Sequence, residues 1–117
     1  MKNMNKKNQT FQLYDLKIEV CRQEGNKPMV CNHKEGSFFY LKGENIIFPE
    51  GTTFPIYCLA SLMPILPAKQ RETDPFDWMS TDAHVACPDP YCAGLFKITR
   101  LPKKNTFNRE DVTVVKI

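Results

Sequence analysis

The stretch HVACPDPYCAGLFKITRL, residues 84 to 101, decides how the carboxyl-terminal part of the chain folds. It contains two short extended segments on either side of a loop that holds two cysteines with two prolines between them. This pattern predicts a β-hairpin in which Cys87 ends one strand and Cys92 opens the next. The two thiols are either functional groups at the hairpin tip or small apolar residues of the core.

Further strands are predicted on the amino-terminal side of this hairpin. In FQLYDLKIEVCRQ, residues 11 to 23, apolar residues at 16, 18 and 20 alternate with charged residues at 17 and 19. That alternation is typical of a half-buried strand, and Cys21 lies near the end of this strand. The segment SFFYLKGENIIFPEG indicates two more strands, Ser37 to Leu41 and Asn45 to Phe48, joined by a tight turn. A last short strand is expected in DVTVVKI, residues 111 to 117.

One helix is predicted after Gly51. Thr52 or Thr53 is a suitable cap, and Pro55 suits the first turn, where its missing N–H would have no partner. Pro64 must kink or end the helix. An apolar stripe at helical spacing consists of Ile56, Leu59, Leu62 and Leu66, and it places Cys58, one turn before Leu62, on the inward side.

These elements predict an α+β fold, with a small, mostly antiparallel sheet packed against one main helix. The length of 117 residues is within the usual range for one domain. Residues 1–9 are polar and basic, and we expect them to form a disordered tail. Residues 10–117 are expected to form a single α+β domain.

Composition indicates an ordinary globular protein rather than a nucleic-acid or membrane protein. The net charge of +3 comes partly from the amino-terminal MKNMNKK and from Lys103–Lys104, and the rest of the chain shows no basic face or stripe. No apolar run approaches the roughly 20 residues needed to cross a bilayer. The first ten residues lack the apolar region of a secretory signal. We therefore expect a cytoplasmic location.

The five cysteines are expected to be free thiols, because thiols stay reduced in the cytoplasm and an odd number cannot pair completely. The end of the first strand, the start of the helix and the hairpin tip can meet at one edge of the fold. A zinc or iron site there would use thiolate and imidazole ligands. The predicted metal ligands are Cys21, Cys31, Cys58 and Cys87, with His33 in reserve. Cys92 is expected to lie outside this set.

Two other interpretations of the cysteines stay open. No pair has the C-x2-C spacing of a zinc ribbon, so the thiols are equally compatible with small buried core residues. Alternatively, Cys58 or Cys87 is a reactive thiol. Unpaired N–H groups near a helix amino-terminus lower the pKa of a thiol such as that of Cys58. The available bases are His33 and His84.

Four segments, taken in order, carry a resemblance to a known family. They are IEVC with a further cysteine ten residues later, HKEG, FPEGTTFPIYCLASLMPIL, and ACPD followed by GLFKITRL. Together they resemble a family of small prokaryotic proteins of about ninety residues that has no assigned function and sometimes occurs as a tandem repeat. The resemblance covers about Leu16 to Leu101. It implies a compact α+β domain with shared use of cysteines at the positions of Cys21, Cys31, Cys58 and Cys87, and it implies no reaction. Cys92 and both terminal segments look like additions to the family pattern.

Three function classes follow from the sequence. The leading hypothesis is a cytosolic, cysteine-rich accessory protein that binds a metal, zinc or iron, or a cofactor. The second is a thiol-dependent enzyme or redox protein that uses Cys58 or Cys87. The third is an interaction module with structural buried cysteines, for which a homo-oligomer is one form. The expected partner is a protein or a small molecule, not a membrane or a nucleic acid.

Overall fold

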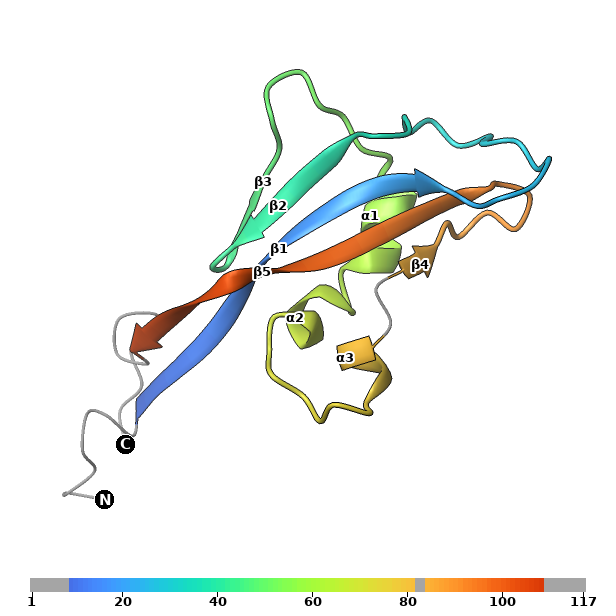
Figure 1. Cartoon of the computed structure of the whole chain (residues 1–117). Helices are drawn as coiled ribbons and strands as arrows, with labels where there is room; N and C mark the ends of the chain where they lie inside the picture. The colour runs from blue at the N-terminus through green and yellow to red at the C-terminus, as the bar shows by residue number, and fades with distance from the viewer. Residues whose placement is uncertain (1–8, 82–83, 109–117) are drawn as a thin grey trace.

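The computed structural model of the chain describes residues 9–81 and 84–108, which form one antiparallel sheet with short helices (Figure 1). The sheet has five strands in the order β3-β2-β1-β5-β4. All neighbouring strands pair antiparallel. The strands are β1 (Thr10–Arg22), β2 (Phe38–Lys42), β3 (Asn45–Ile47), β4 (His84–Ala86) and β5 (Gly94–Asn108), and the helices are α1 (Ile56–Leu62), α2 (Leu66–Lys69) and α3 (Trp78–Thr81).

The predicted antiparallel sheet is confirmed, whereas the helical part is smaller than an α+β fold with one main helix would have. Within residues 9–81 and 84–108 the fold is mostly β, and the longest helix there has seven residues. The tail predicted for residues 1–9 lies outside the described residues except for its last residue. The strand predicted for residues 111–117 also lies outside them.

Prolines set both ends of α1. Pro55 occupies the N-cap position, and no side chain caps the helix, so the predicted cap by Thr52 or Thr53 is wrong. The helix ends at Leu62, because Pro64 has no N–H to continue the hydrogen-bond ladder. The chain then turns and resumes as α2. The inward side of the two helices carries Cys58, Leu62 and Leu66, which are buried as predicted, whereas Ile56 is 72% exposed.

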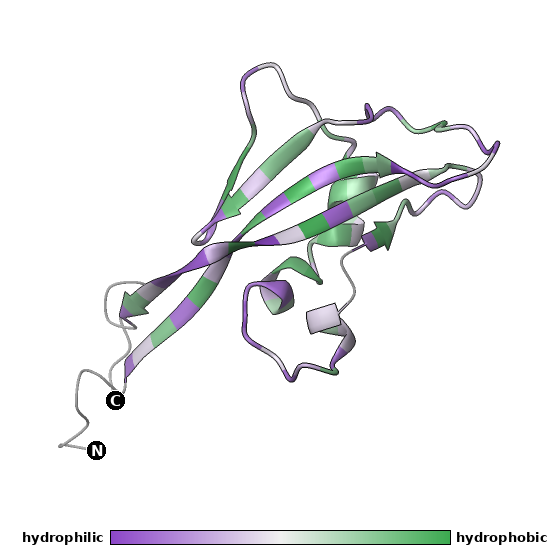
Figure 2. Cartoon of the chain, in the orientation of Figure 1, coloured by the Kyte–Doolittle hydropathy of each residue, from purple (hydrophilic) through white to green (hydrophobic). Residues whose placement is uncertain are grey.

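The hydrophobic core lies between the sheet and α1 and α2. Residues along β1 alternate in hydropathy, and Figure 2 shows the same alternation along β5. The inward residues of both strands are almost fully buried and pack against β2 and the helices. These core residues include Leu16, Ile18, Val20, Phe39, Phe96 and Ile98. Among the described residues, no helix is long and apolar enough to span a membrane.

Strand β5 is longer than the predicted hairpin strand. It continues through Pro102 to Asn108 and pairs with the start of β1 (Figure 1). Proline cannot donate to a ladder, but the register shifts between Tyr14 and Leu16, so Pro102 lies at a bulge where no such bond is required. The result is a two-stranded ribbon that extends beyond the five-stranded part of the sheet.

Candidate metal centre

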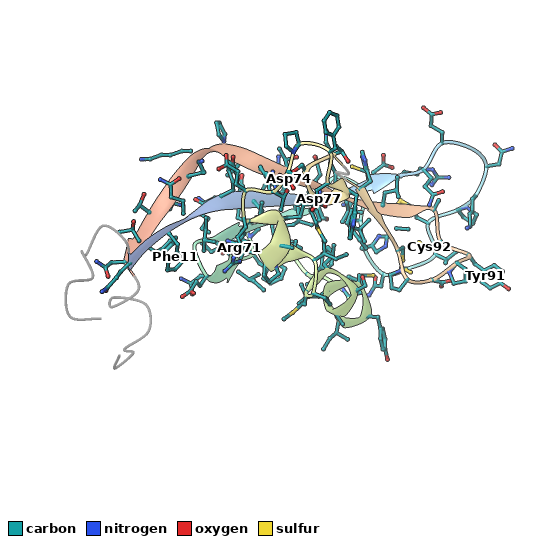
Figure 3. The ribbon with its side chains drawn as sticks, turned by 90° about the horizontal axis from the view of Figure 1, so that it is seen from below. Phe11, Arg71, Asp74, Asp77, Tyr91 and Cys92 are labelled. Atoms are coloured by element: carbon teal, nitrogen blue, oxygen red, sulfur yellow. The ribbon has the colours of Figure 1, made fainter. Side chains whose placement is uncertain are left out.

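Two loops that are far apart in the sequence, the β1–β2 loop and the β4–β5 loop, meet where β1 stops and β5 begins. Cys31 and His33 lie in the loop between β1 and β2, Cys87 follows β4, and Cys92 lies two residues before β5. Figure 3 shows Cys92 at the end of the molecule opposite to Phe11, which belongs to the start of β1. The donor side chains are therefore carried by loops at one end of a rigid pair of strands.

The loop between β4 and β5 is a closed turn. The backbone N–H of Cys87 donates to the carbonyl of Gly94 at 3.0 Å, and that of Cys92 donates to the carbonyl of Asp89, also at 3.0 Å. The Asp89 carboxylate accepts from the N–H of Tyr91 at 2.9 Å. Asp commonly forms such turns with the backbone two residues ahead. This turn places Cys87 and Cys92 close together at the two ends of the loop between β4 and β5.

Backbone hydrogen bonds attach the loop after β1 to this hairpin. The N–H of Gln23 donates to the carbonyl of Ala93 at 2.8 Å, and the N–H of Ala93 donates to the carbonyl of Pro28 at 2.9 Å. The Lys27 ammonium also donates to the carbonyl of Pro90. These bonds hold the loop against the hairpin, and Cys31 and His33 therefore lie beside Cys87 and Cys92.

The four donor groups have the spacing of ligands around one metal ion. One donor atom from each of Cys31, His33, Cys87 and Cys92 lies within 4.8 Å of all the others. The Sγ atoms of Cys31 and Cys87 are 3.1 Å apart, and Nε2 of His33 is 3.9 Å from Sγ of Cys92. Two sulfurs bound to zinc at ≈ 2.3 Å lie about 3.8 Å apart in a tetrahedron. The distances within the set bracket this value, so the three thiols and one imidazole could hold a metal ion such as zinc.

The imidazole of His33 is held in place by packing on Phe96 and by the contact of its Nε2 atom with Cys92. Its ring meets the edge of Phe96, with ring centroids 5.4 Å apart. Its Nδ1 atom is buried and has no hydrogen-bond partner among the described residues. Burial lowers the pKa of His33, which favours the neutral form that binds metals. With Nε2 directed toward Cys92, the buried Nδ1 is the kind of group that an ordered water would satisfy.

Gly94 makes room for this ring. A Cβ atom at Gly94 would lie 2.5 Å from Cε1 and 2.8 Å from Nε2 of His33. No side chain can be added at this position unless the imidazole moves. The glycine in the CAGLF segment is therefore explained by the close approach of His33 to the start of β5.

The Cys92 sulfur lies in an environment that stabilises a thiolate. Burial raises the pKa of its thiol, but backbone hydrogen bonds from Cys31, Gly94 and Val30 outweigh burial and lower the pKa to about 7. The N–H of Gly94 lies 3.4 Å from the sulfur. Thiolates, not thiols, bind metals, so Cys92 is prepared for ligation by the backbone around it.

The other sulfurs of this end of the molecule are crowded against one another. The hydrogen bond with Cys87 and burial both raise the pKa of Cys31. Burial and the proximity of Cys87 raise the pKa of Cys58 to about 12, and the Sγ atoms of Cys58 and Cys87 are 4.0 Å apart. A bound cation reverses this effect, because its charge stabilises the thiolates that otherwise repel one another.

The structure brings together three of the predicted ligands, Cys31, Cys87 and His33. Cys58 lies beside them, as the inward side of α1 predicts, but outside the set of four. Cys21 does not join them. It lies on the face of β1 opposite to the buried Val20, and its thiol donates to the carbonyl of Glu19 at 3.8 Å. The observed set thus contains His33 and Cys92 where the prediction had Cys21 and Cys58.

Cys92 was not expected in the cluster, although its spacing of five positions from Cys87 could have predicted that the two side chains lie close together. A short loop closes a β-hairpin, so residues at its two ends lie side by side. Cys87 and Cys92 occupy these two ends, on either side of the PDPY segment. The alternation of side chains along β1 also argued against Cys21 as a ligand. One face of β1 holds residues 16, 18 and 20, so residue 21 must point to the opposite face.

Comparisons with protein-family models, with curated proteins and with solved structures found no match. The function is therefore inferred from the geometry of the site.

Proposed function

We propose that the protein is a metal-binding accessory domain that holds one Zn²⁺ through Cys31, His33, Cys87 and Cys92. A single observation carries this proposal: four donor atoms from two loops far apart in the sequence lie within 4.8 Å of one another. A set of three sulfurs and one imidazole nitrogen suits zinc better than magnesium, calcium or manganese, which prefer oxygen ligands.

The metal supplies a positive charge that keeps the thiols deprotonated, and it cross-links the loops. Cys31 and His33 belong to the loop after β1, and Cys87 and Cys92 belong to the β4–β5 hairpin. Between these segments there are only short stretches of backbone hydrogen bonding in the described residues. A structural zinc contributes its binding free energy to folding, so the ordered form of this end depends on the ion.

Elemental analysis and cobalt substitution test the proposal. Protein produced without chelator or a metal-affinity tag is expected to contain one equivalent of zinc. After replacement by Co²⁺, it should show the intense visible bands of a tetrahedral thiolate site. The variant C92S should lose both signals, whereas C21S, the matched control on the opposite face of β1, should keep them. A folded protein that binds neither metal would overturn the proposal.

The location of the protein in a reducing compartment such as the cytoplasm is part of the proposal, because the five cysteines are all free thiols. Membership of the small four-cysteine family is also a proposal. If both hold, Cys92 is an additional ligand specific to this chain, and the family's cysteine at the position of Cys21 has another role.

A second candidate function, thiol–disulfide chemistry, is favoured by the distance of 3.1 Å between the sulfurs of Cys31 and Cys87. In metal-free protein, hydrogen peroxide would oxidise these two thiols to a disulfide and be reduced to water. Peptide mapping without reductant distinguishes the two functions. Fast formation of this disulfide even with zinc bound would favour the redox function, and protection by zinc would favour the metal site. Burial raises the pKa of the Cys58 thiol to about 12, which disfavours the reactive thiolate predicted at that position.

A further inference from the structure

A pocket of about 470 Å³ lies beside the candidate metal centre. Cys31 belongs both to its wall and to the ligand set, and Cys58 lines it from α1. The volume is within the range of small-molecule sites in proteins. The pocket thus gives a small molecule access to one side of the sulfur cluster.

The outer wall of the pocket is apolar and exposed. It includes Ile56 and Tyr57, of which 72% and 80% are exposed, together with Pro55 and Pro88. Ile56 and Tyr57 are the first residues of α1, Pro55 precedes them, and Pro88 follows Cys87. An apolar body of a ligand would be buried against these side chains, and the Tyr57 ring would also attract a cation.

The charge at the inner wall is negative. Asp89 lines the pocket, and its Oδ2 atom is 4.0 Å from the sulfur of Cys31. None of the described residues that line the pocket is basic. A zinc ion with three thiolates and a neutral imidazole carries a net charge of about −1. When Cys31 binds the ion it no longer donates a proton, and Oδ2 of Asp89 is then available to another donor.

We propose that this pocket binds a small organic cation, an amine attached to an apolar body. Its ammonium group hydrogen-bonds to Asp89 and faces the thiolate of Cys31, and its apolar body packs against Ile56 and Tyr57. This inference rests on the proposed function, because a metal bound by Cys31 would replace its contact with Asp89 and leave Oδ2 of Asp89 open to the pocket.

Three probes of the same size and different charge test the pocket: benzylamine, benzyl alcohol and benzoate. Each is titrated, at constant ionic strength, into zinc-loaded protein labelled with nitrogen-15, and amide shifts are followed by NMR. Benzylamine should shift the amides of Asn32, Ile56 and Asp89 in a saturable manner. Benzyl alcohol should do so more weakly, and benzoate should cause no shift at the same concentrations.

Asp89→Asn is the decisive variant, since an amide oxygen can still accept from the N–H of Tyr91 while the charge is removed. Its affinity for benzylamine should fall about tenfold and its affinity for benzyl alcohol should not change. Asp74→Asn, which removes an exposed carboxylate elsewhere (Figure 3), should change neither. Equal shifts from all three probes, or no shifts in protein that contains zinc, would overturn this inference alone. Protein that holds no zinc overturns the proposed function, and this inference with it.

Discussion

The two ends of the β1–β5 strand pair are stabilised in different ways. At one end, Thr10 to Tyr14 pair with Lys104 to Asn108 in a regular ladder, and Phe11 stacks on Phe107 with ring centroids 5.4 Å apart. At the other end β1 stops and β5 begins, and loops carry three sulfurs and an imidazole. The first end is stabilised by local pairing, and the second depends on the groups that the loops bring together.

Hydrogen bonds from polar side chains stabilise the end of the β1–β5 pair at which Thr10 to Tyr14 pair with Lys104 to Asn108, here called the ribbon end, and they involve no metal. Oδ1 of Asp15, at the bulge, accepts hydrogen bonds from the N–H of Gly43 at 2.9 Å and from the side chain of Asn105 at 2.6 Å. Gln70 is buried and donates to the carbonyl of Gly43 at 2.6 Å. These bonds satisfy the irregular backbone next to the register shift. At the sulfur end, the proposed metal–ligand bonds would take this role, so perturbations should separate the two ends.

The largest effect is expected from Cys87→Ser in zinc-loaded protein. Cys87 lies within hydrogen-bond reach of both Cys31 and Cys58, and its loss removes one of four ligands. A thousandfold weaker affinity for zinc corresponds to a loss of about 4 kcal/mol in the free energy of unfolding at saturating metal. Urea denaturation in a zinc buffer measures it.

Cys21→Ser is the matched control for that substitution, because Cys21 lies on the opposite face of the sheet. Its free energy of unfolding should change by less than about 1 kcal/mol, with no change in zinc affinity. If both variants lost stability and zinc equally, the distinction between the cluster and the opposite face of β1 would be wrong.

The next effect in size is expected from Gly94→Ala. The new methyl group would lie 2.5 Å from the His33 ring, which must move away from the ligand set. We expect zinc affinity to fall about 10- to 100-fold, as for other changes that misplace a ligand. Competition with a chromophoric chelator measures this. Gly51→Ala strains a backbone with φ of 79° and has no neighbour within 4 Å, so it should leave zinc affinity unchanged.

Much of the sheet could be predicted because its residues follow a strict period. The alternation along β1 defined the strand to within one residue at each end, and Pro64 marked the break between α1 and α2. The extension of β5 could not be read in the same way. Pro102 normally argues against a strand, and only the register shift opposite Asp15 makes the proline acceptable there.

Part of the candidate site could also be predicted, since Cys31, His33 and Cys87 were among the candidates. The choice between Cys21 and Cys92 needed the direction of side chains, which strand parity and the short hairpin loop determine. The position of the His33 ring could not be predicted from the sequence. The ring fits there only because Gly94, 61 residues further along the chain, has no side chain, and no local sequence pattern links the two residues.

A smaller effect, confined to the ribbon end, is expected from Phe107→Ala. The substitution removes the stack on Phe11 and the contact with the turn at Gly43, where a Cβ would lie 3.2 Å from the Phe107 ring. We expect a loss of about 1–2 kcal/mol in the free energy of unfolding, because the side chain is only half-buried. Zinc affinity should not change. A parallel loss of zinc affinity would show that the two ends are coupled through the strands.

The smallest effect is a pH dependence of the metal-free protein that originates at the sulfur end. Burial lowers the pKa of His33 below its ordinary value of 6.5. Between the folded pKa and 6.5, the unfolded chain therefore binds more protons at this residue than the folded chain does. Stability should rise with pH across this window and fall as the pH drops through the folded pKa. Urea denaturation of reduced, EDTA-treated protein at a series of pH values measures the slope. His33→Gln should remove part of this slope and His84→Gln should retain it. Equal slopes in both variants would mean that His33 is not buried in the metal-free protein, and that the loop after β1 reaches the hairpin only when the metal is bound.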